Sequence, residues 1–149
     1  MLTLTTLSEG VIDMVRLIMG GKGEGKTKQL IDMLNNAAKD EEGSVVCIEA
    51  TRNMTFNIHY QIRLIDAQEY DLHSYDIFRG FIIGLYAGNY DISHIFIDDL
   101  RKIVGLDVDS NMEAFLDWLD LFGERHGIKF TVTVSADRST ATDGMKHYL

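Results

Sequence analysis

Five short stretches of the sequence are rich in apolar and β-branched residues, and helical patterns separate most of them. The stretches are residues 14–19, 45–48, 63–66, 95–97 and 130–134. In the segments 26–39, 76–87 and 110–127, apolar residues recur as they do on one face of a helix. Strands that are apolar throughout and alternate with helices are typical of a parallel sheet covered on both faces. The pattern predicts an α/β fold of three layers, with helices on both faces of a mostly parallel five-stranded sheet.

Composition narrows the range of functions. The chain has 149 residues, which suits one domain, and a formal charge of −9. Such an acidic chain repels a nucleic-acid backbone, so nucleic acid is not expected as a main partner. Cys47 is the single cysteine, which excludes an internal disulfide and a four-cysteine zinc site. Apolar runs are shorter than the roughly 18 residues of a membrane helix, and the beginning, MLTLTTLSEGVID, lacks the basic start of a secretory signal. We therefore expect a cytoplasmic protein without a membrane span.

The string GGKGEGKT occupies residues 20–27, between the first expected strand and the first expected helix. It satisfies the pattern G-x-x-x-x-G-K-[ST], whose glycines let backbone amides surround a phosphate chain at a helix N-terminus. In that pattern Lys26 reaches the β- and γ-phosphates, and Thr27 offers its hydroxyl to Mg²⁺. Lys22 is more simply interpreted as an exposed loop charge. The predicted nucleotide-binding residues are Gly20, Gly21, Lys22, Gly23, Glu24, Gly25, Lys26, Thr27 and Lys28.

An acidic pair, Asp98 and Asp99, follows the apolar run at residues 95–97. When a nucleotide is bound, a carboxylate at such a strand end orients the water shell of Mg²⁺, so Asp98 and Thr27 are the expected metal-site residues. Lys26 and Asp99 are the candidate catalytic residues, and the alternative for Asp99 is a plain loop carboxylate. Ligands of open parallel sheets bind beyond the carboxyl ends of the strands. That rule points to residues 20–27, 98–99 and 135–138.

Other polar residues near the expected strand ends have plainer interpretations. Ser135 is a candidate sensor of the γ-phosphate, although a strand-end turn is the favoured alternative. Arg101 and Arg138 are candidates for supplying positive charge to a transition state, but surface arginines are common. Arg52 and Asn53 follow the second strand and are candidates to line a substrate or partner site, although a simple turn is the favoured alternative.

Three further features point to structure rather than chemistry. The five histidines lack the spacing of metal ligands. Cys47 lies inside an apolar strand and is expected to be a packed core thiol. Ser110 and Glu113 fit a capping box at the start of a helix.

The strings GGKGEGKTKQL and HIFIDDL together resemble those of the P-loop NTPase superfamily. More narrowly, VRLIMGGKGEGKTKQL, QIRLIDAQEY and KFTVTVSAD are similar to a group of short bacterial P-loop proteins labelled only as ATP-binding. The resemblance implies a P-loop sandwich that binds a nucleoside triphosphate with Mg²⁺ through the residues named above. The sequence lacks the guanine-reading string N-K-x-D, which favours ATP, and lacks the transporter string L-S-G-G-Q. Small thymidine kinases have a similar layout, but they place Glu where Asp99 stands and carry zinc-binding cysteines.

These expectations leave three functions. The first is an ATPase that couples binding or hydrolysis of Mg·ATP to a conformational or assembly change. The second is a kinase that transfers the γ-phosphate to a nucleoside-like small molecule, with an acceptor pocket in residues 50–71. The third is a module that binds ATP without hydrolysing it and then binds a partner. Residues 14–149 are expected to form one nucleotide-binding domain, and residues 1–13 an extension without a catalytic part. A protein partner and a homo-oligomer stay open.

Overall fold

The computed structural model describes residues 13–21, 23, 25–52 and 58–149. Expectations that concern residues 1–12, Lys22, Glu24 and Asn53 therefore lie outside the described residues. The described strands form one sheet in the spatial order β1-β5-β4-β2-β3, and every neighbouring pair is parallel. Their bounds are β1 (Val15–Gly20), β2 (Ser44–Glu49), β3 (Arg63–Asp66), β4 (Ile92–Asp98) and β5 (Lys129–Ser135). The five expected strands are confirmed, and their pairing is wholly rather than mostly parallel.

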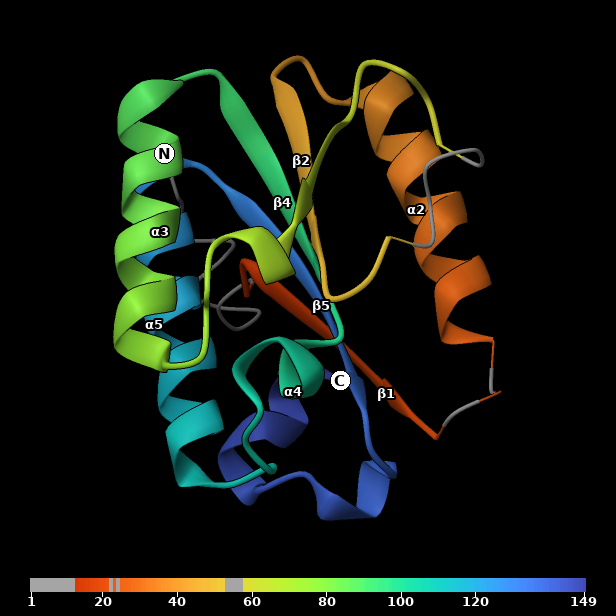
Figure 1. The fold of residues 1–149 in the computed structure, drawn as a ribbon, viewed down its shortest axis with the longest axis vertical. Coiled ribbons are helices and arrows are strands. Elements are labelled where there is room, and N and C mark those ends of the chain that lie inside the picture. The colour runs from red at the N-terminus through yellow and green to blue at the C-terminus, as the bar shows by residue number, and fades with distance from the viewer. Residues whose placement is uncertain (1–12, 22, 24, 53–57) are drawn as a thin grey trace, which may run out of the picture.

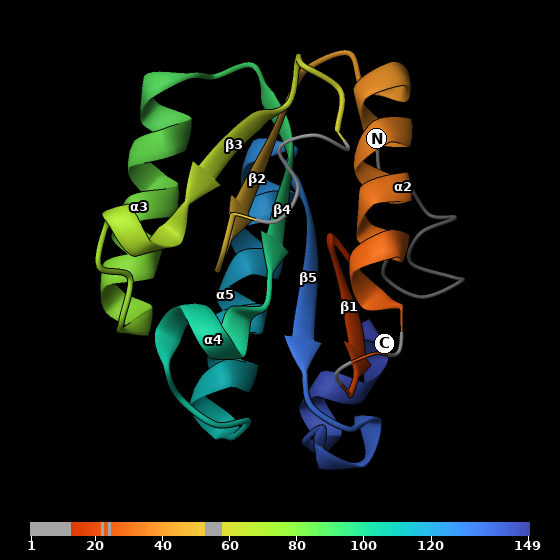
Figure 2. The same cartoon turned by 45° about the vertical axis from the view of Figure 1, so that its right-hand side comes forward.

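Helices cover both faces of this sheet (Figure 1 and Figure 2). Helix α2 (Lys26–Asp40) packs on one face, whereas α3 (Tyr75–Gly88) and α5 (Ser110–His126) lie on the other. Each face has its own apolar core. The smaller core, under α2, includes Leu30, Leu34, Ala37, Val45, Cys47 and Phe96. The larger core, under α3 and α5, includes Phe78, Ile82, Phe115, Leu116 and Val132. The predicted α/β arrangement is therefore confirmed, and Cys47 is the packed core thiol that was expected.

The capping box expected at Ser110 and Glu113 is wrong. Asp109 caps α5 instead, and its carboxylate accepts hydrogen bonds from two backbone N–H groups of the first turn. Ser110 is the first helical residue, while the Glu113 carboxylate accepts a hydrogen bond from the Thr142 hydroxyl. Aspartate caps helices as well as serine does, and the contact with Thr142 joins residues far apart in the sequence. A local pattern therefore could not distinguish the two caps.

Several short helical elements have too few residues to produce a periodic pattern. Helix α4 (Leu100–Val104) follows β4 directly and buries Leu100, Ile103 and Val104 in the larger core. The others are three 3₁₀ turns, η1 (Ala67–Glu69), η2 (Arg138–Thr140) and η3 (Asp143–Tyr148). In the part of the chain that the structure describes, no helix combines the length and the apolar character needed to cross a bilayer.

Strand alternation places polar groups at the carboxyl end of the sheet, on the face that α2 covers. Cys47 and Phe96 pack under α2, and side chains two residues apart on a strand share a face. Glu49 on β2 and Asp98 on β4 therefore lie on that face too. Thr133 of the neighbouring strand β5 donates a hydrogen bond to Asp98. All three polar side chains are buried, so this end of the sheet differs from the apolar core below it.

A mostly buried imidazole lies at the opposite end of the sheet. His94 on β4 stacks on Phe96 with ring centroids 4.1 Å apart, and its Nε2 lies 2.9 Å from Thr131 Oγ1. Glu41 Oε2 is 3.8 Å from His94 Nδ1 and 2.8 Å from the ammonium of Lys129. Burial disfavours the charged imidazolium and outweighs the attraction of the Glu41 carboxylate. The pKa of His94 consequently falls to about 4.

We expect the protein to lose stability between pH 7 and pH 5 because His94 is held neutral in the fold. On unfolding, the pKa of the ring returns to about 6.5, so the unfolded chain binds more protons in this pH range than the folded chain does. The free energy of unfolding therefore decreases as the pH is lowered. The expected loss from this residue is about 2 kcal/mol of unfolding free energy. Urea denaturation at both pH values measures it. Between pH 7 and pH 5, a His94→Gln variant should lose about 2 kcal/mol less unfolding free energy than the wild type. Equal losses in the two proteins would contradict the prediction.

Candidate functional site

The connection between β1 and α2 contains two left-handed glycines. Gly23 has a φ of 86° and Gly25 a φ of 79°, conformations that a residue with a Cβ adopts at a cost of about 1–2 kcal/mol. Gly25 is also the N-cap of α2 and provides no side-chain cap, so first-turn N–H groups are available to an anion. Lys26 is the first helical residue, and its ammonium donates to the Gly21 carbonyl at 2.8 Å. The strand expected before the glycine loop and the helix expected after it are present.

A cavity of about 520 Å³ adjoins this loop. Its walls come from the loop itself, from α4, and from the carboxyl ends of β2, β4 and β5. The lining residues are Gly23, Gly25, Lys26, Thr27, Ala50, Thr51, Asp98, Asp99, Lys102 and Ser135. The parallel sheet is the reason for this gathering, because the carboxyl ends of parallel strands meet at one edge. Lys26, Thr27, Asp98, Asp99 and Ser135, predicted from separate parts of the sequence, therefore line one cavity.

Asp98 is a mostly buried carboxylate in the wall of this cavity. Its Oδ1 accepts a hydrogen bond of 2.9 Å from the Thr133 hydroxyl. Burial raises the pKa of Asp98, and the charge of the neighbouring Asp99 raises it further, whereas the Thr133 hydrogen bond and the Lys26 ammonium act in the opposite direction. A cation placed beside Asp98 would relieve the cost of keeping its charge in a buried position.

Asp99, which also lines this cavity, has an unusual backbone conformation. Its φ is 67°, a left-handed value that is rare outside glycine but that aspartate tolerates better than most residues. The backbone N–H of Asp99 donates to Thr133 Oγ1 at 2.8 Å, and its Oδ2 accepts a hydrogen bond of 3.1 Å from Ser135 Oγ. Asp99 also caps α4, since its Oδ1 accepts from the N–H of Lys102 at 3.4 Å. These bonds fix the carboxylate between β5 and α4.

A second cavity, of about 510 Å³, lies on the other side of Asp99. It shares Asp99, Lys102 and Ser135 with the first cavity and adds Arg101, Gly105, Leu106 and Asp107. Arg101 belongs to this second cavity, where its guanidinium donates to Asp107 Oδ1 at 2.6 Å and to the Ser135 carbonyl at 3.0 Å. The side chain that was a candidate transition-state cation thus holds α4 against the end of β5.

Other predicted residues lie outside the lining of the first cavity. Gly20 is the last residue of β1 and pairs in register with Ser135. Lys28 and Arg138 are exposed and line neither of the two cavities. Arg52 Nε lies 3.8 Å from Asp66 Oδ2, so its nearest acidic partner is at the end of β3. The candidate site therefore consists mainly of the second half of the glycine loop and the acidic pair.

Three residues near the site were not identified from the sequence. Thr133 and Lys102 lack a motif, since one is an alternating residue of β5 and the other belongs to a helix of five residues. Glu49 is only 1% exposed and pairs in register with Asp98. Burial and the nearby charges of Asp98 and Glu49 raise the pKa of the Cys47 thiol. A carboxylate directly after the apolar run at residues 45–48 was the available signal for Glu49.

Two oxygen-bearing side chains of the cavity, those of Thr27 and Asp98, are of the type that Mg²⁺ prefers. Magnesium keeps several waters and is usually bound through one or two carboxylates together with substrate phosphates. The cavity is lined by both Thr27, in the first turn of α2, and Asp98, at the end of β4. Among the described residues, no group of three or more His, Cys, Asp or Glu side chains is arranged to hold a metal without such added ligands.

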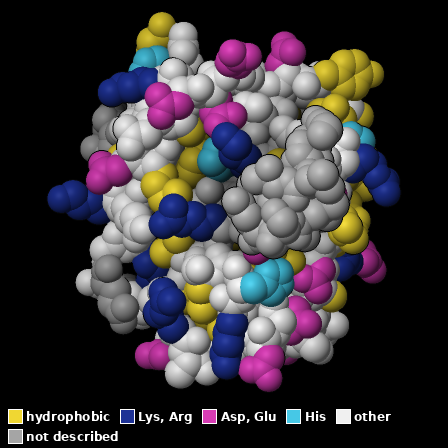
Figure 3. Space-filling view, turned by 180° about the vertical axis from the view of Figure 1, so that it is seen from behind, with side chains coloured by type: hydrophobic (Ala, Val, Ile, Leu, Met, Phe, Trp, Pro, Cys, Tyr) yellow, Lys and Arg dark blue, Asp and Glu magenta, His cyan; other side chains and the backbone are white. Residues whose placement is uncertain are grey.

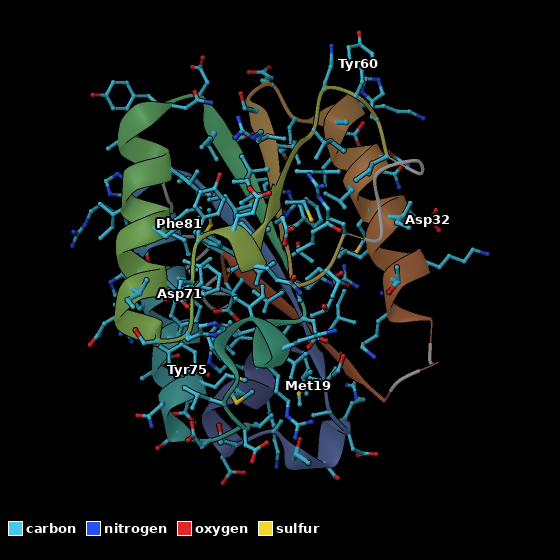
Figure 4. All side chains as sticks on the ribbon, viewed as in Figure 1. Met19, Asp32, Tyr60, Asp71, Tyr75 and Phe81 are labelled. Atoms are coloured by element: carbon cyan, nitrogen blue, oxygen red, sulfur yellow. The ribbon has the colours of Figure 1, made fainter. Side chains whose placement is uncertain are left out.

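Charged side chains are unevenly distributed over one face of the molecule. Although the formal charge is −9, Lys and Arg side chains gather toward the α2 side of the face seen from behind in Figure 3. The exposed aromatic ring of Tyr60 lies near the end of α2 that is farthest from the glycine loop (Figure 4). Tyr60 is therefore not placed to stack on a ligand in the cavity.

Compared with protein-family models and with curated proteins, the chain matches no family model and no curated sequence.

Proposed function

We propose that the protein binds Mg·ATP as a member of the P-loop NTPase superfamily and hydrolyses it to drive a conformational or assembly change. The observation that carries this proposal is the presence of Lys26, Thr27, Asp98 and Asp99 in one cavity beside a loop of left-handed glycines. The three-layer fold, with the loop after β1 and the acidic pair after β4, supports a P-loop sandwich. A cytoplasmic location stays a prediction from the sequence.

Different groups of the chain would bind the phosphates and the Mg²⁺ ion of Mg·ATP. Backbone N–H groups of the glycine loop and the first turn of α2 would surround the phosphates, because a helix N-terminus favours an anion. The Lys26 ammonium would exchange the Gly21 carbonyl for phosphate oxygens. Thr27 and Asp98 would hold Mg²⁺, which supplies positive charge to the phosphates when bound. The missing guanine-reading motif favours ATP over GTP.

Asp99 is the candidate base for hydrolysis. In this step a water oxygen forms a bond to the γ-phosphorus, the bond from that phosphorus to the ADP oxygen breaks, and the water proton passes to a carboxylate. Asp99 lines the cavity and is held by Ser135, so its orientation is fixed before a ligand arrives. The buried carboxyl group of Glu49 lies beside Asp98 on the neighbouring strand β2.

A small-molecule kinase is the second candidate because the second cavity adjoins the first at Asp99. An acceptor hydroxyl there would take the place of water, and Asp99 would accept the hydroxyl proton. This location differs from the region 50–71 expected from the sequence. ATP consumption that requires an added nucleoside or other hydroxyl compound would favour the kinase. Tight binding without turnover, together with an ATP-dependent protein complex, would favour a binding module.

Calorimetric titration with ATP, with and without Mg²⁺, tests the proposal. We expect Mg²⁺ to strengthen ATP binding, and Asp98→Asn to weaken the Mg²⁺-dependent binding by about 10-fold or more, since groups that orient a metal's water shell contribute on this scale. Asp32→Asn is the matched control, because Asp32 projects from the outer side of α2 (Figure 4). No affinity for ATP or GTP at millimolar concentration would overturn the proposal. Equal effects of Asp98→Asn with and without Mg²⁺ would overturn the metal assignment.

A further inference from the structure

Lys102 is a cation of the first cavity that no motif predicts. Lys26 and Lys102 both line that cavity, but their ammonium groups differ in their partners. The Lys26 ammonium donates to Gly21, and the neighbouring Arg101 is engaged by Asp107 and Ser135. Among the described residues, the Lys102 ammonium has no hydrogen-bonding or ion-pair partner. Its charge is available to a ligand.

The backbone that carries Lys102 is firmly anchored. Leu100, Ile103 and Val104 of α4 are buried in the larger core. The Asp99 carboxylate accepts a hydrogen bond from the Lys102 N–H, and Arg101 ties α4 to the end of β5. Lys102 therefore has a fixed Cα position beside Asp99 and an exposed side chain. A fixed backbone reduces the entropy that a lysine loses when it binds an anion.

The position of Lys102 in the cavity indicates which part of a nucleotide it would meet. Gly23, Gly25 and Lys26 come from the loop after β1 and the start of α2, whereas Asp98, Asp99 and Lys102 come from the end of β4 and from α4, and β5 separates the two strands in the sheet. A terminal phosphate that approaches Asp98 and Asp99 meets two carboxylates, which repel it. Lys102 is the described cation that α4 contributes to this cavity, and it lies three residues after Asp99, whose carboxylate accepts a hydrogen bond from the Lys102 N–H.

We propose that Lys102 binds the γ-phosphate and makes the site distinguish a nucleoside triphosphate from a diphosphate. This inference rests on the proposed function, because it needs a nucleotide in the first cavity. Lys102 supplies within the same chain the positive charge that some P-loop proteins take from a partner. ADP lacks the phosphate that Lys102 contacts, so the contribution of Lys102 to ADP binding is small. Since Lys102 also lines the second cavity, a change in its position alters both cavities.

Calorimetric titrations of Mg·ATP and Mg·ADP test this role in the wild type and in three variants. Lys102→Ala should weaken ATP binding about 10-fold or more, in keeping with the loss of one charged hydrogen bond, and should change ADP binding by less than about 2-fold. Lys102→Arg should keep ATP binding within about 3-fold of the wild type, because it retains the charge. Lys39→Ala removes an equal charge from the far end of α2 and should leave both affinities unchanged.

The outcomes separate this inference from the function on which it rests. Unchanged ATP binding in Lys102→Ala overturns the inference and leaves nucleotide binding intact. Equal weakening of ATP and ADP also overturns it, because a general electrostatic effect does not depend on the γ-phosphate. A wild-type protein that binds neither nucleotide overturns both proposals. Thermal denaturation of each variant shows whether α4 keeps its place, and a Lys102→Ala protein with wild-type stability and selective loss of ATP binding supports the role.

Discussion

A Lys26→Ala variant should bind Mg·ATP at least about 100-fold more weakly than the wild type. Hydrogen bonds to charged groups contribute about 1.5–3 kcal/mol each, and an ammonium in this position reaches two phosphates. A loss of about 1.4 kcal/mol corresponds to a tenfold change in affinity, so two such bonds account for the expected effect. Hydrolysis should fall below detection for the same reason. Isothermal titration and phosphate release measure the two quantities.

The fold should survive this substitution, which makes the result interpretable. Lys26 is partly exposed in the first turn of α2, and alanine is a good helix former. The hydrogen bond that it loses goes to the carbonyl of Gly21, a residue that is only partly buried. Lys39→Ala, at the other end of α2, controls for the change in net charge. Wild-type ATP affinity in Lys26→Ala would contradict the placement of phosphates at the glycine loop.

The parallel sheet and the position of the glycine loop were predictable because their causes are local. An apolar run such as that of β4 signals a buried strand without its neighbours, and the glycines before Lys26 signal a loop that needs left-handed backbone. Cys47 was placed in the core for the same reason. Parallel pairing then brings strand ends together, so the meeting of Asp98 with Lys26 follows from the fold class alone.

The parts that were not predicted depend on contacts between distant residues. Arg101 is held by the end of β5, and Glu113 is engaged by Thr142 from the C-terminal segment. Lys102 belongs to a helix too short to show periodicity, so its place in the cavity depends on how Asp99 turns the chain. Such contacts arise only when separate elements pack, and no local signal in the sequence encodes them.

A Gly123→Ala variant should lose about 3 kcal/mol of unfolding free energy. A Cβ at Gly123 would lie 2.3 Å from the backbone carbonyl oxygen of Ile128 and 2.9 Å from the Cβ of Met14. Backbone atoms cannot move aside as a flexible side chain does, so the last turn of α5 must shift from the sheet, at a cost typical of an overpacked core. The Gly123 carbonyl also accepts the N–H of Ile128, and this contact fixes how the chain enters β5.

Gly84→Ala is the matched control substitution, and we expect it to increase the free energy of unfolding. Gly84 lies in the exposed part of α3, and a Cβ there would meet nothing within 4 Å. Alanine in a helix is more favourable than glycine by about 1 kcal/mol, so this variant should be more stable than the wild type. Urea denaturation of the three proteins measures both differences. Equal stability of Gly123→Ala and Gly84→Ala would contradict the close packing of α5 against the strands that lead to the glycine loop and to Ser135.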